Sequence, residues 1–136
     1  MRTGRRAGDI EQTLDTTAGG LYQVMFFLAG NPTCGNAVKG LDVGATGNPT
    51  SHYTFDVTGH SSSSMGWQRE TYLFVATGAI TTLLFESRET SARGPALDNV
   101  AVTEVPPIPA LSPTLGAVLA LLTAVAVWLA LARRAE

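Results

Sequence analysis

The sequence contains little cysteine and little charge. Cys34 is the only cysteine among 136 residues, so no disulfide can form within the chain and no cysteine-rich metal framework exists. Charged residues make up 15% of the chain, with 9 Lys and Arg against 11 Asp and Glu, and the basic residues form no continuous stripe. A protein that binds nucleic acid needs a basic surface to neutralise phosphates. The composition therefore indicates that nucleic acid is not a partner.

The amino-terminal residues lack an apolar run. "MRTGRRAGDIEQ" carries the positive charge of a signal peptide, but the apolar stretch of roughly 7–15 residues that a signal peptide needs does not follow it. No export signal is visible on this reading, and we expect residues 1–8 to be disordered.

Catalytic motifs are also missing. "GHSSSSMG" does not contain the G-x-S-x-G turn of serine hydrolases, and "GLDVGATG" has the spacing of neither a dinucleotide-binding loop nor a P-loop. His52 and His60 would lie about 26 Å apart on an extended strand, which is too far for one zinc ion. The sequence shows no paired acid and base, so we predict that the protein is not an enzyme.

The body of the chain, residues 9–105, has the spacing of an all-β sandwich. Clusters of Gly, Asn, Pro and Ser interrupt it about every 8–12 residues, as expected for short strands joined by turns. The expected strands are Ile10–Leu14, Tyr22–Ala29, Val38–Ala45, His52–Val57, Gln68–Ala76, Thr81–Ser87 and Leu97–Glu104.

Two of these strands indicate how the sandwich is layered. "HYTFDV" alternates Tyr53, Phe55 and Val57 with polar residues, which predicts one buried face and one solvated face. "LYQVMFFLAG" is apolar at nearly every position from Val24 to Leu28, which predicts a central strand covered on both sides.

The carboxyl-terminal segment differs from the body. Residues 115–132 contain no charge and no proline, and a helix of that length reaches about 27 Å, close to the hydrocarbon thickness of a bilayer. A soluble helix would show a polar stripe, and none exists here, so we predict a transmembrane helix. Arg133 and Arg134 follow the helix directly and predict that residues 133–136 are cytoplasmic and the body extracytoplasmic. Residues 106–114, rich in proline, form the expected extended spacer.

"IPALSP", followed by an apolar helix and a terminal Arg pair, resembles the IPTL-type sorting signal of Gram-negative bacterial envelope proteins. The resemblance implies a membrane-embedded sorting or processing enzyme as a partner, and a location in the cell envelope with possible release to the cell surface. The residues of the motif are Ile108, Pro109, Ala110, Leu111, Ser112 and Pro113.

The body resembles the choice-of-anchor C family of bacterial surface proteins. "IEQTLDTTAGGLYQVMFFLAGNP", "MGWQRETYLFVATGAITTLLFES" and "GPALDNVAV" carry the resemblance, which implies a galactose-binding-like jelly roll. Such domains usually begin with an Asn-Gly-Ser-Phe-Glu type strand, which this sequence does not contain. We therefore expect an amino-terminally truncated domain, with an unpaired edge and an uncovered core face.

Asp98 is the candidate metal ligand. In related carbohydrate-binding jelly rolls an acidic residue on the last strand helps to hold a structural calcium ion, so the resemblance implies this role for Asp98. The alternative is an aspartate that bonds to the local backbone at a turn.

Trp67 and Tyr53 are the aromatic candidates for stacking on a sugar ring, and Asn31 and Asn36 lie in a loop where they could bond to hydroxyl groups. The alternatives are core packing for the two rings and turn formation for the two amides. Together with the fold these residues favour an envelope-anchored module that binds carbohydrate or cell-wall polymer. A structural or adhesion protein that acts through protein contacts is the second hypothesis.

Overall fold

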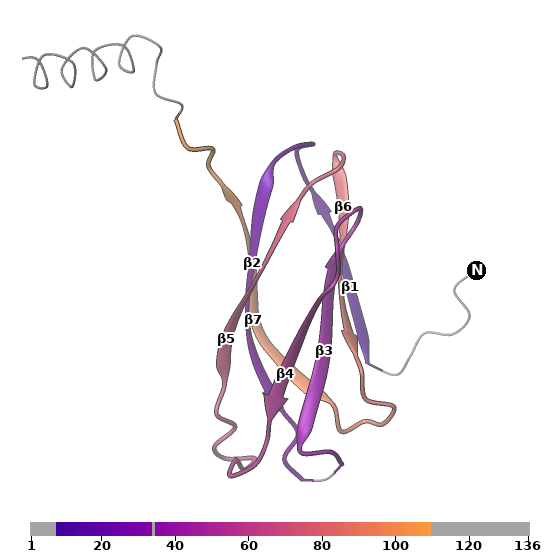
Figure 1. Cartoon of the computed structure of the whole chain (residues 1–136), viewed down its shortest axis with the longest axis vertical. Helices are drawn as coiled ribbons and strands as arrows, with labels where there is room; N and C mark the ends of the chain where they lie inside the picture. The colour runs from indigo at the N-terminus through magenta and orange to yellow at the C-terminus, as the bar shows by residue number, and fades with distance from the viewer. Residues whose placement is uncertain (1–7, 34, 110–136) are drawn as a thin grey trace, which may run out of the picture. The chain divides into compact units, whose positions relative to one another are not determined.

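Two antiparallel sheets form the body of the protein (Figure 1). The computed structural model describes residues 8–33 and 35–109. The four-stranded sheet has the order β1-β6-β3-β4 and the three-stranded sheet the order β5-β2-β7. The strands are β1 (Asp9–Asp15), β2 (Leu21–Gly30), β3 (Val38–Ala45), β4 (Ser51–Asp56), β5 (Gln68–Val75), β6 (Ile80–Ser87) and β7 (Pro95–Val105). The strands predicted from the sequence are confirmed, with every boundary within two residues.

The core lies between the sheets and centres on Phe26 of β2. Its ring packs edge-on against Tyr53 and Phe85 of the four-stranded sheet, with centroids 5.2 and 5.5 Å away. On the three-stranded sheet Phe74 stacks on Tyr22 at 5.3 Å. Edge-to-face and offset-stacked pairs are the arrangements that the charge distribution of aromatic rings favours. Aromatic contacts therefore join the two sheets.

Strand alternation sets which residues enter this core. The prediction for "HYTFDV" is confirmed, because Phe55 is buried while His52 and Thr54 are exposed. The prediction for β2 is confirmed only in part: β2 is the central strand of its sheet, but Met25 and Phe27 are partly exposed on its outer face. No second layer of strands covers that face within the described residues, so the continuous apolar run was wrongly interpreted as burial on both sides.

Side-chain hydrogen bonds close the sandwich where the edge strands β4 and β5 meet. The Tyr53 hydroxyl donates to the Thr71 carbonyl of β5 at 2.8 Å, and the Tyr72 hydroxyl donates to the Pro49 carbonyl at 2.8 Å. The Asn48 carboxamide pairs with the backbone of Val75, donating to its carbonyl at 2.8 Å and accepting from its amide at 2.9 Å. Three side chains thus make the bonds that a continuous sheet would make with backbone.

The opposite side of the four-stranded sheet is more open. β1 is an edge strand, and six of its seven residues are exposed. Ile10 is 57% exposed although it alternates with polar neighbours, so part of the inner face at β1 is uncovered, as the sequence predicted. The truncation that motivated this expectation stays a prediction.

Lys39 is the one lysine of the chain, and it is completely buried. It lies on β3, where its Cγ packs close to the bare Cα of Gly30. Lysine is rarely buried without a polar partner, and every buried side-chain nitrogen or oxygen in the described part of the chain has a hydrogen-bond partner. The sequence pattern did not reveal this position.

The predicted membrane segment, residues 115–132, lies outside the described residues, as do Arg133 and Arg134. Among the residues that the structure describes, no helix is long and apolar enough to cross a bilayer. Of the predicted sorting motif only Ile108 and Pro109 are described, and the Ile108 side chain is 93% exposed.

The tyrosine bonds give a first prediction. Tyr53→Phe and Tyr72→Phe should each lower the free energy of unfolding by about 1 kcal/mol at neutral pH, because each leaves a backbone carbonyl without its donor. Burial raises the pKa of both hydroxyls above the ordinary value of 10.0. Their contribution is therefore fully present below pH 10 and is lost as the pH rises through the raised pKa of the folded state.

Urea unfolding at neutral and alkaline pH measures both effects. Thr54→Ala, an exposed change on the neighbouring position of β4, is the control and should be close to neutral. A double Tyr→Phe variant that loses as much stability above pH 10 as the parent would contradict the assignment.

Candidate functional site

Three side chains form a row across the outer face of the three-stranded sheet, and together with Trp67 we call them the sheet platform: Phe27, Trp67, Arg69 and Asp98. Phe27 on the central strand pairs with Arg69 of β5 on one side and with Asp98 of β7 on the other. Trp67 directly precedes β5, and extending the alternation of the strand by one residue places it on the side of Arg69. Positions far apart in the sequence are thus neighbours.

The platform combines aromatic surface with charge. Trp67 is 41% exposed, Phe27 is half-buried, and Arg69 and Asp98 are exposed. The Arg69 side chain makes no ion pair or hydrogen bond with another described residue. A flat ring flanked by planar polar groups suits the apolar face and the rim hydroxyls of a sugar.

A β-bulge places Asp98 in this row. The pairing of β2 with β7 shifts between Met25 and Phe27, and Asn99 takes a left-handed conformation at φ 49°. The Asp98 carboxylate accepts a hydrogen bond from the Asn99 amide at 2.8 Å, which stabilises the bulge. Bulges commonly re-aim side chains beside binding sites.

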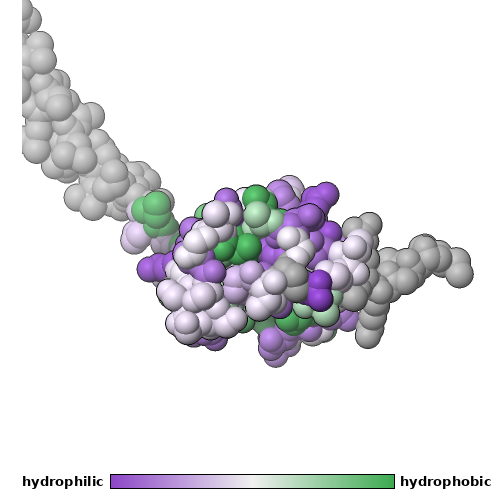
Figure 2. Space-filling model, turned by 90° about the horizontal axis from the view of Figure 1, so that it is seen from below, coloured by the Kyte–Doolittle hydropathy of each residue, from purple (hydrophilic) through white to green (hydrophobic). Residues whose placement is uncertain are grey.

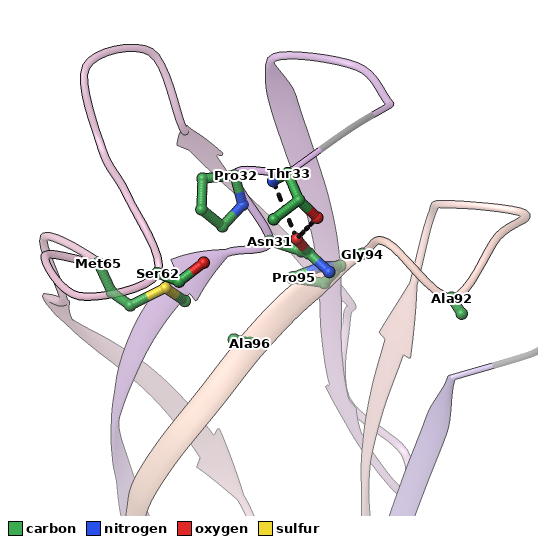
Figure 3. Close-up of a pocket in the computed structure, with 9 residues that line it drawn as sticks. All are labelled: Asn31, Pro32, Thr33, Ser62, Met65, Ala92, Gly94, Pro95 and Ala96. Atoms are coloured by element: carbon green, nitrogen blue, oxygen red, sulfur yellow. Dashed lines mark hydrogen bonds between the residues drawn. The ribbon is translucent and has the colours of Figure 1, made fainter.

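A pocket of about 430 Å³, which we call the end pocket, lies at the loop end of the same sheet (Figure 3). Ala96 on its wall pairs with Ala29, two residues along β2 and β7 from the Phe27–Asp98 pair. The other lining residues are Asn31, Pro32, Thr33, Ser62, Met65, Ala92, Gly94 and Pro95. Three loops contribute: β2–β3, β4–β5 and β6–β7.

Asn31 organises one wall of the end pocket. Its carboxamide oxygen accepts from the Thr33 amide at 3.0 Å and from the Thr33 hydroxyl at 2.6 Å (Figure 3). Its backbone amide donates to the Gly94 carbonyl at 3.1 Å, which ties the β2–β3 loop to the β6–β7 loop. The oxygen is occupied, so the carboxamide nitrogen is the group that Asn31 can offer to a ligand.

The β4–β5 loop is held in place by His60. Its ring lies between Phe55, with centroids 5.3 Å apart, and the bare Cα of Gly66 at φ +71°. At the start of the loop, Asp56 accepts a bond from the Thr58 amide at 2.9 Å. Hydrogen bonds from Thr58, and to a smaller extent the His60 ring, lower the pKa of the Asp56 carboxyl. These contacts position Met65 and Trp67.

The structure brings together some of the residues that the sequence singled out. Trp67 and Asp98 share the platform face, and Asn31 lines the neighbouring end pocket. Asn36 is exposed on the Asn31 loop but does not line the end pocket. Tyr53 packs on Phe26 and bonds to β5, so its ring serves the core contact that was its alternative role. Contacts with sugar stay predictions for the four ligand-binding candidates Trp67, Tyr53, Asn31 and Asn36.

Phe27 and Arg69 are not among the residues that the sequence predicts for the site. Phe27 belongs to the apolar run that predicts a strand covered on both sides, and Arg69 lies inside a predicted strand without a recognisable motif. Their common face follows from alternation within each strand, but their adjacency follows only from the pairing of β2 with β5.

The described residues do not supply a metal centre around Asp98. No group of three or more His, Cys, Asp or Glu side chains there is arranged to hold a metal ion. One Asp98 oxygen is already used by the bulge, while calcium takes about six to eight oxygen ligands. The described residues around Asp98 do not complete a calcium site by themselves, so calcium at Asp98 stays a prediction.

The loop end has a mixed surface. Seen from that end, hydrophilic side chains surround separate hydrophobic areas (Figure 2). A small ligand site of this kind needs both apolar contact and a few directional polar groups.

Comparison with protein families places the chain. A family model described as "Protein of unknown function (DUF642)" matches residues 1–103. The chain belongs to the DUF642 family. No curated protein matches its sequence.

A solved structure described as "CBM4 structure and function", a carbohydrate-binding module, is similar to this DUF642 chain. The TM-score is 0.52 with 15% sequence identity, over 71% of the chain and 61% of the CBM4 chain, so the DUF642 chain spans about three fifths of that protein. At this identity the likeness shows the fold, an all-β sandwich of two antiparallel sheets. The choice-of-anchor C and sorting-signal resemblances stay predictions.

Gly66 gives a second prediction. A Cβ at residue 66 would collide with the His60 ring, and φ +71° is strained for any side chain. Gly66→Ala should therefore lower the free energy of unfolding by about 2–3 kcal/mol and displace Met65 and Trp67.

Gly59→Ala is the matched control for Gly66→Ala. Gly59 lies in the same loop at φ +79°, with nothing within 4 Å of an added Cβ, so this change should cost only about 1 kcal/mol. Thermal unfolding and Trp67 fluorescence measure the difference. Equal effects of the two changes would mean that His60 does not hold the loop.

Proposed function

We propose that this DUF642 chain is a non-catalytic carbohydrate-binding module, and that the sheet platform with the adjoining end pocket is its glycan site. The single observation that carries the proposal is the row of Arg69, Phe27 and Asp98 across one sheet face, with the exposed Trp67 two residues before Arg69 along the chain. The likeness of the fold to a carbohydrate-binding module supports the ligand class. We propose cell-wall polymer as its source.

Each group has a role in this proposal. Trp67 stacks on the apolar face of one sugar ring, and its partly buried neighbour Phe27 extends that surface. Arg69 donates up to two parallel hydrogen bonds to adjacent hydroxyls, and the free oxygen of Asp98 accepts from a hydroxyl on the other side. The end pocket receives the next sugar residue of the glycan, and the Asn31 carboxamide nitrogen donates a hydrogen bond to one of its hydroxyl groups.

Trp67→Ala tests the glycan site. On an array of soluble glycans the parent protein should give saturable binding to at least one polysaccharide class, and Trp67→Ala should weaken it by roughly tenfold or more, about 1.4 kcal/mol. Ile10→Ala removes an exposed apolar side chain from the other sheet and should change nothing. An array without any saturable signal would overturn the proposal, as would equal binding by the parent and Trp67→Ala.

A structural or adhesion role is the second candidate, and the far half of the same sheet face favours it. Leu21, Leu73 and Val75 are 37%, 54% and 46% exposed, and the pairing of β2 with β5 makes them neighbours. A contiguous apolar patch of this kind is typical of protein contact sites. If Leu73→Ser abolished self-association or partner capture while glycan binding stayed absent, this role would replace the first.

We further propose that the carboxyl-terminal segment anchors the module to a bacterial envelope, with the sandwich extracytoplasmic. The support is sequence alone: the uncharged segment 115–132, the Arg pair after it and the motif of Ile108 to Pro113, which we propose a sorting enzyme reads.

Membrane extraction tests the anchor. In bacterial membranes washed with alkaline carbonate, the full chain should stay in the pellet, while a chain that ends at Pro109 should be released to the supernatant. Release of the full chain as well would contradict an integral anchor.

A further inference from the structure

The outer face of the four-stranded sheet carries a second pocket, whereas the sheet platform lies on the three-stranded sheet. Its volume is about 280 Å³, and its floor is the backbone of β3 at Gly44. Glu11 of β1, Thr82 and Leu84 of β6, and Thr50 before β4 form its walls. We call it the face pocket.

The glycine at position 44 needs an explanation. Its φ is ordinary for a strand, and an added Cβ would meet only the Thr50 hydroxyl closely, at 3.1 Å, with every other atom at 3.9 Å or beyond. Gly40, four residues earlier on the same strand, differs, because a Cβ there would press on Arg88 and His52, which the Asp42 carboxylate holds together. Packing therefore accounts for Gly40 but only weakly for Gly44.

A glycine inside a strand destabilises the fold, because it loses more conformational entropy on folding than other residues and has no side chain to pack. Such a glycine often marks the close approach of a ligand. At Gly44 the absent side chain leaves the floor of the face pocket open. An alanine there would place a methyl group between the walls.

The walls are rigid. The Asn48 carboxamide donates to the Thr46 carbonyl at 2.9 Å as well as pairing with Val75, and the Thr46 hydroxyl accepts from the Thr82 amide at 2.9 Å. The turn after β3 is thus tied both to β5 and to β6. A pocket shaped by such bonds is preorganised, which lowers the cost of binding.

The polar groups of the face pocket are available. The side-chain oxygens of Glu11, Thr50 and Thr82 have no hydrogen-bond partner among the described residues. Two hydroxyls donate and accept, and a carboxylate accepts two bonds from neighbouring hydroxyls of a ligand. Leu84 offers an apolar surface beside them.

This chemistry selects among ligands. Glu11 repels phosphate and other anions, and the described residues contain no cluster of metal-binding side chains. A sugar ring has several hydroxyl groups, which match the Glu11 carboxylate and the two threonine hydroxyls, and one apolar face, which matches Leu84. The volume of the face pocket is close to the lower limit for small-ligand sites.

We infer that the face pocket is a second saccharide site, which takes a single pyranose ring over Gly44. The inference extends the proposed carbohydrate-binding function to a separate face, and the two sites can be tested independently because they share no residue.

NMR titration of the full chain, with amide shifts recorded against methyl β-D-glucopyranoside and methyl β-D-galactopyranoside, tests the inference. With at least one glycoside the amides of Glu11, Gly44 and Thr82 should shift and saturate. Trp67→Ala should leave these shifts unchanged, so failure of the sheet platform and failure of the face pocket are distinguishable.

Gly44→Ala and Glu11→Gln should each weaken the saturating shifts by about tenfold or more, while Thr54→Ala on the same face should not. Thermal unfolding of each variant shows whether it is folded, and Glu11 is exposed on an edge strand, so Glu11→Gln provides a test even if Gly44→Ala does not fold. No shift at these amides with either glycoside, or unchanged shifts in Glu11→Gln, would overturn the inference.

Discussion

Two tyrosine hydroxyls and one carboxamide hold β4 and β5 together, and the arrangement of both outer sheet faces depends on that closure. β4 and β5 are edge strands of different sheets, so no continuous ladder of backbone hydrogen bonds joins the sheets at this edge. Tyr53, Tyr72 and Asn48 supply the missing bonds, while Phe26 fills the space behind them. These bonds tie the β3–β4 turn and β4 to β5, so this side of the sandwich is closed.

The two faces of the sandwich differ in chemistry. The outer face of the three-stranded sheet presents Trp67 and Phe27 and ends in a pocket lined partly by Pro32 and Met65. The outer face of the four-stranded sheet presents carboxylates, hydroxyls and bare backbone at Gly44. One face is suited to stacking and the other to hydrogen bonding, so the two faces offer different chemistry to a ligand.

Local patterns were enough to predict the strands, because Gly, Asn, Pro and Ser clusters mark turns and alternation marks faces. Pairing could not be predicted in the same way: Phe27 lies between Arg69 and Asp98 only because β2 separates β5 from β7, and sequence spacing does not encode that order. Burial was misjudged at Met25 and Phe27, since an apolar run does not say whether a second layer exists. Trp67 and Asn31 could be named as candidates because aromatic residues and loop amides are recognisable before any fold is known, and their contacts with sugar stay predictions.

The burial of Lys39 has a practical consequence for anyone who handles this protein. No ε-amino group is accessible on the sandwich, since the chain has a single lysine and its side chain is fully covered. Amine-reactive dyes, cross-linkers and coupling resins will therefore leave both outer faces unmodified while the fold is intact, and acylation of Lys39 will report unfolding.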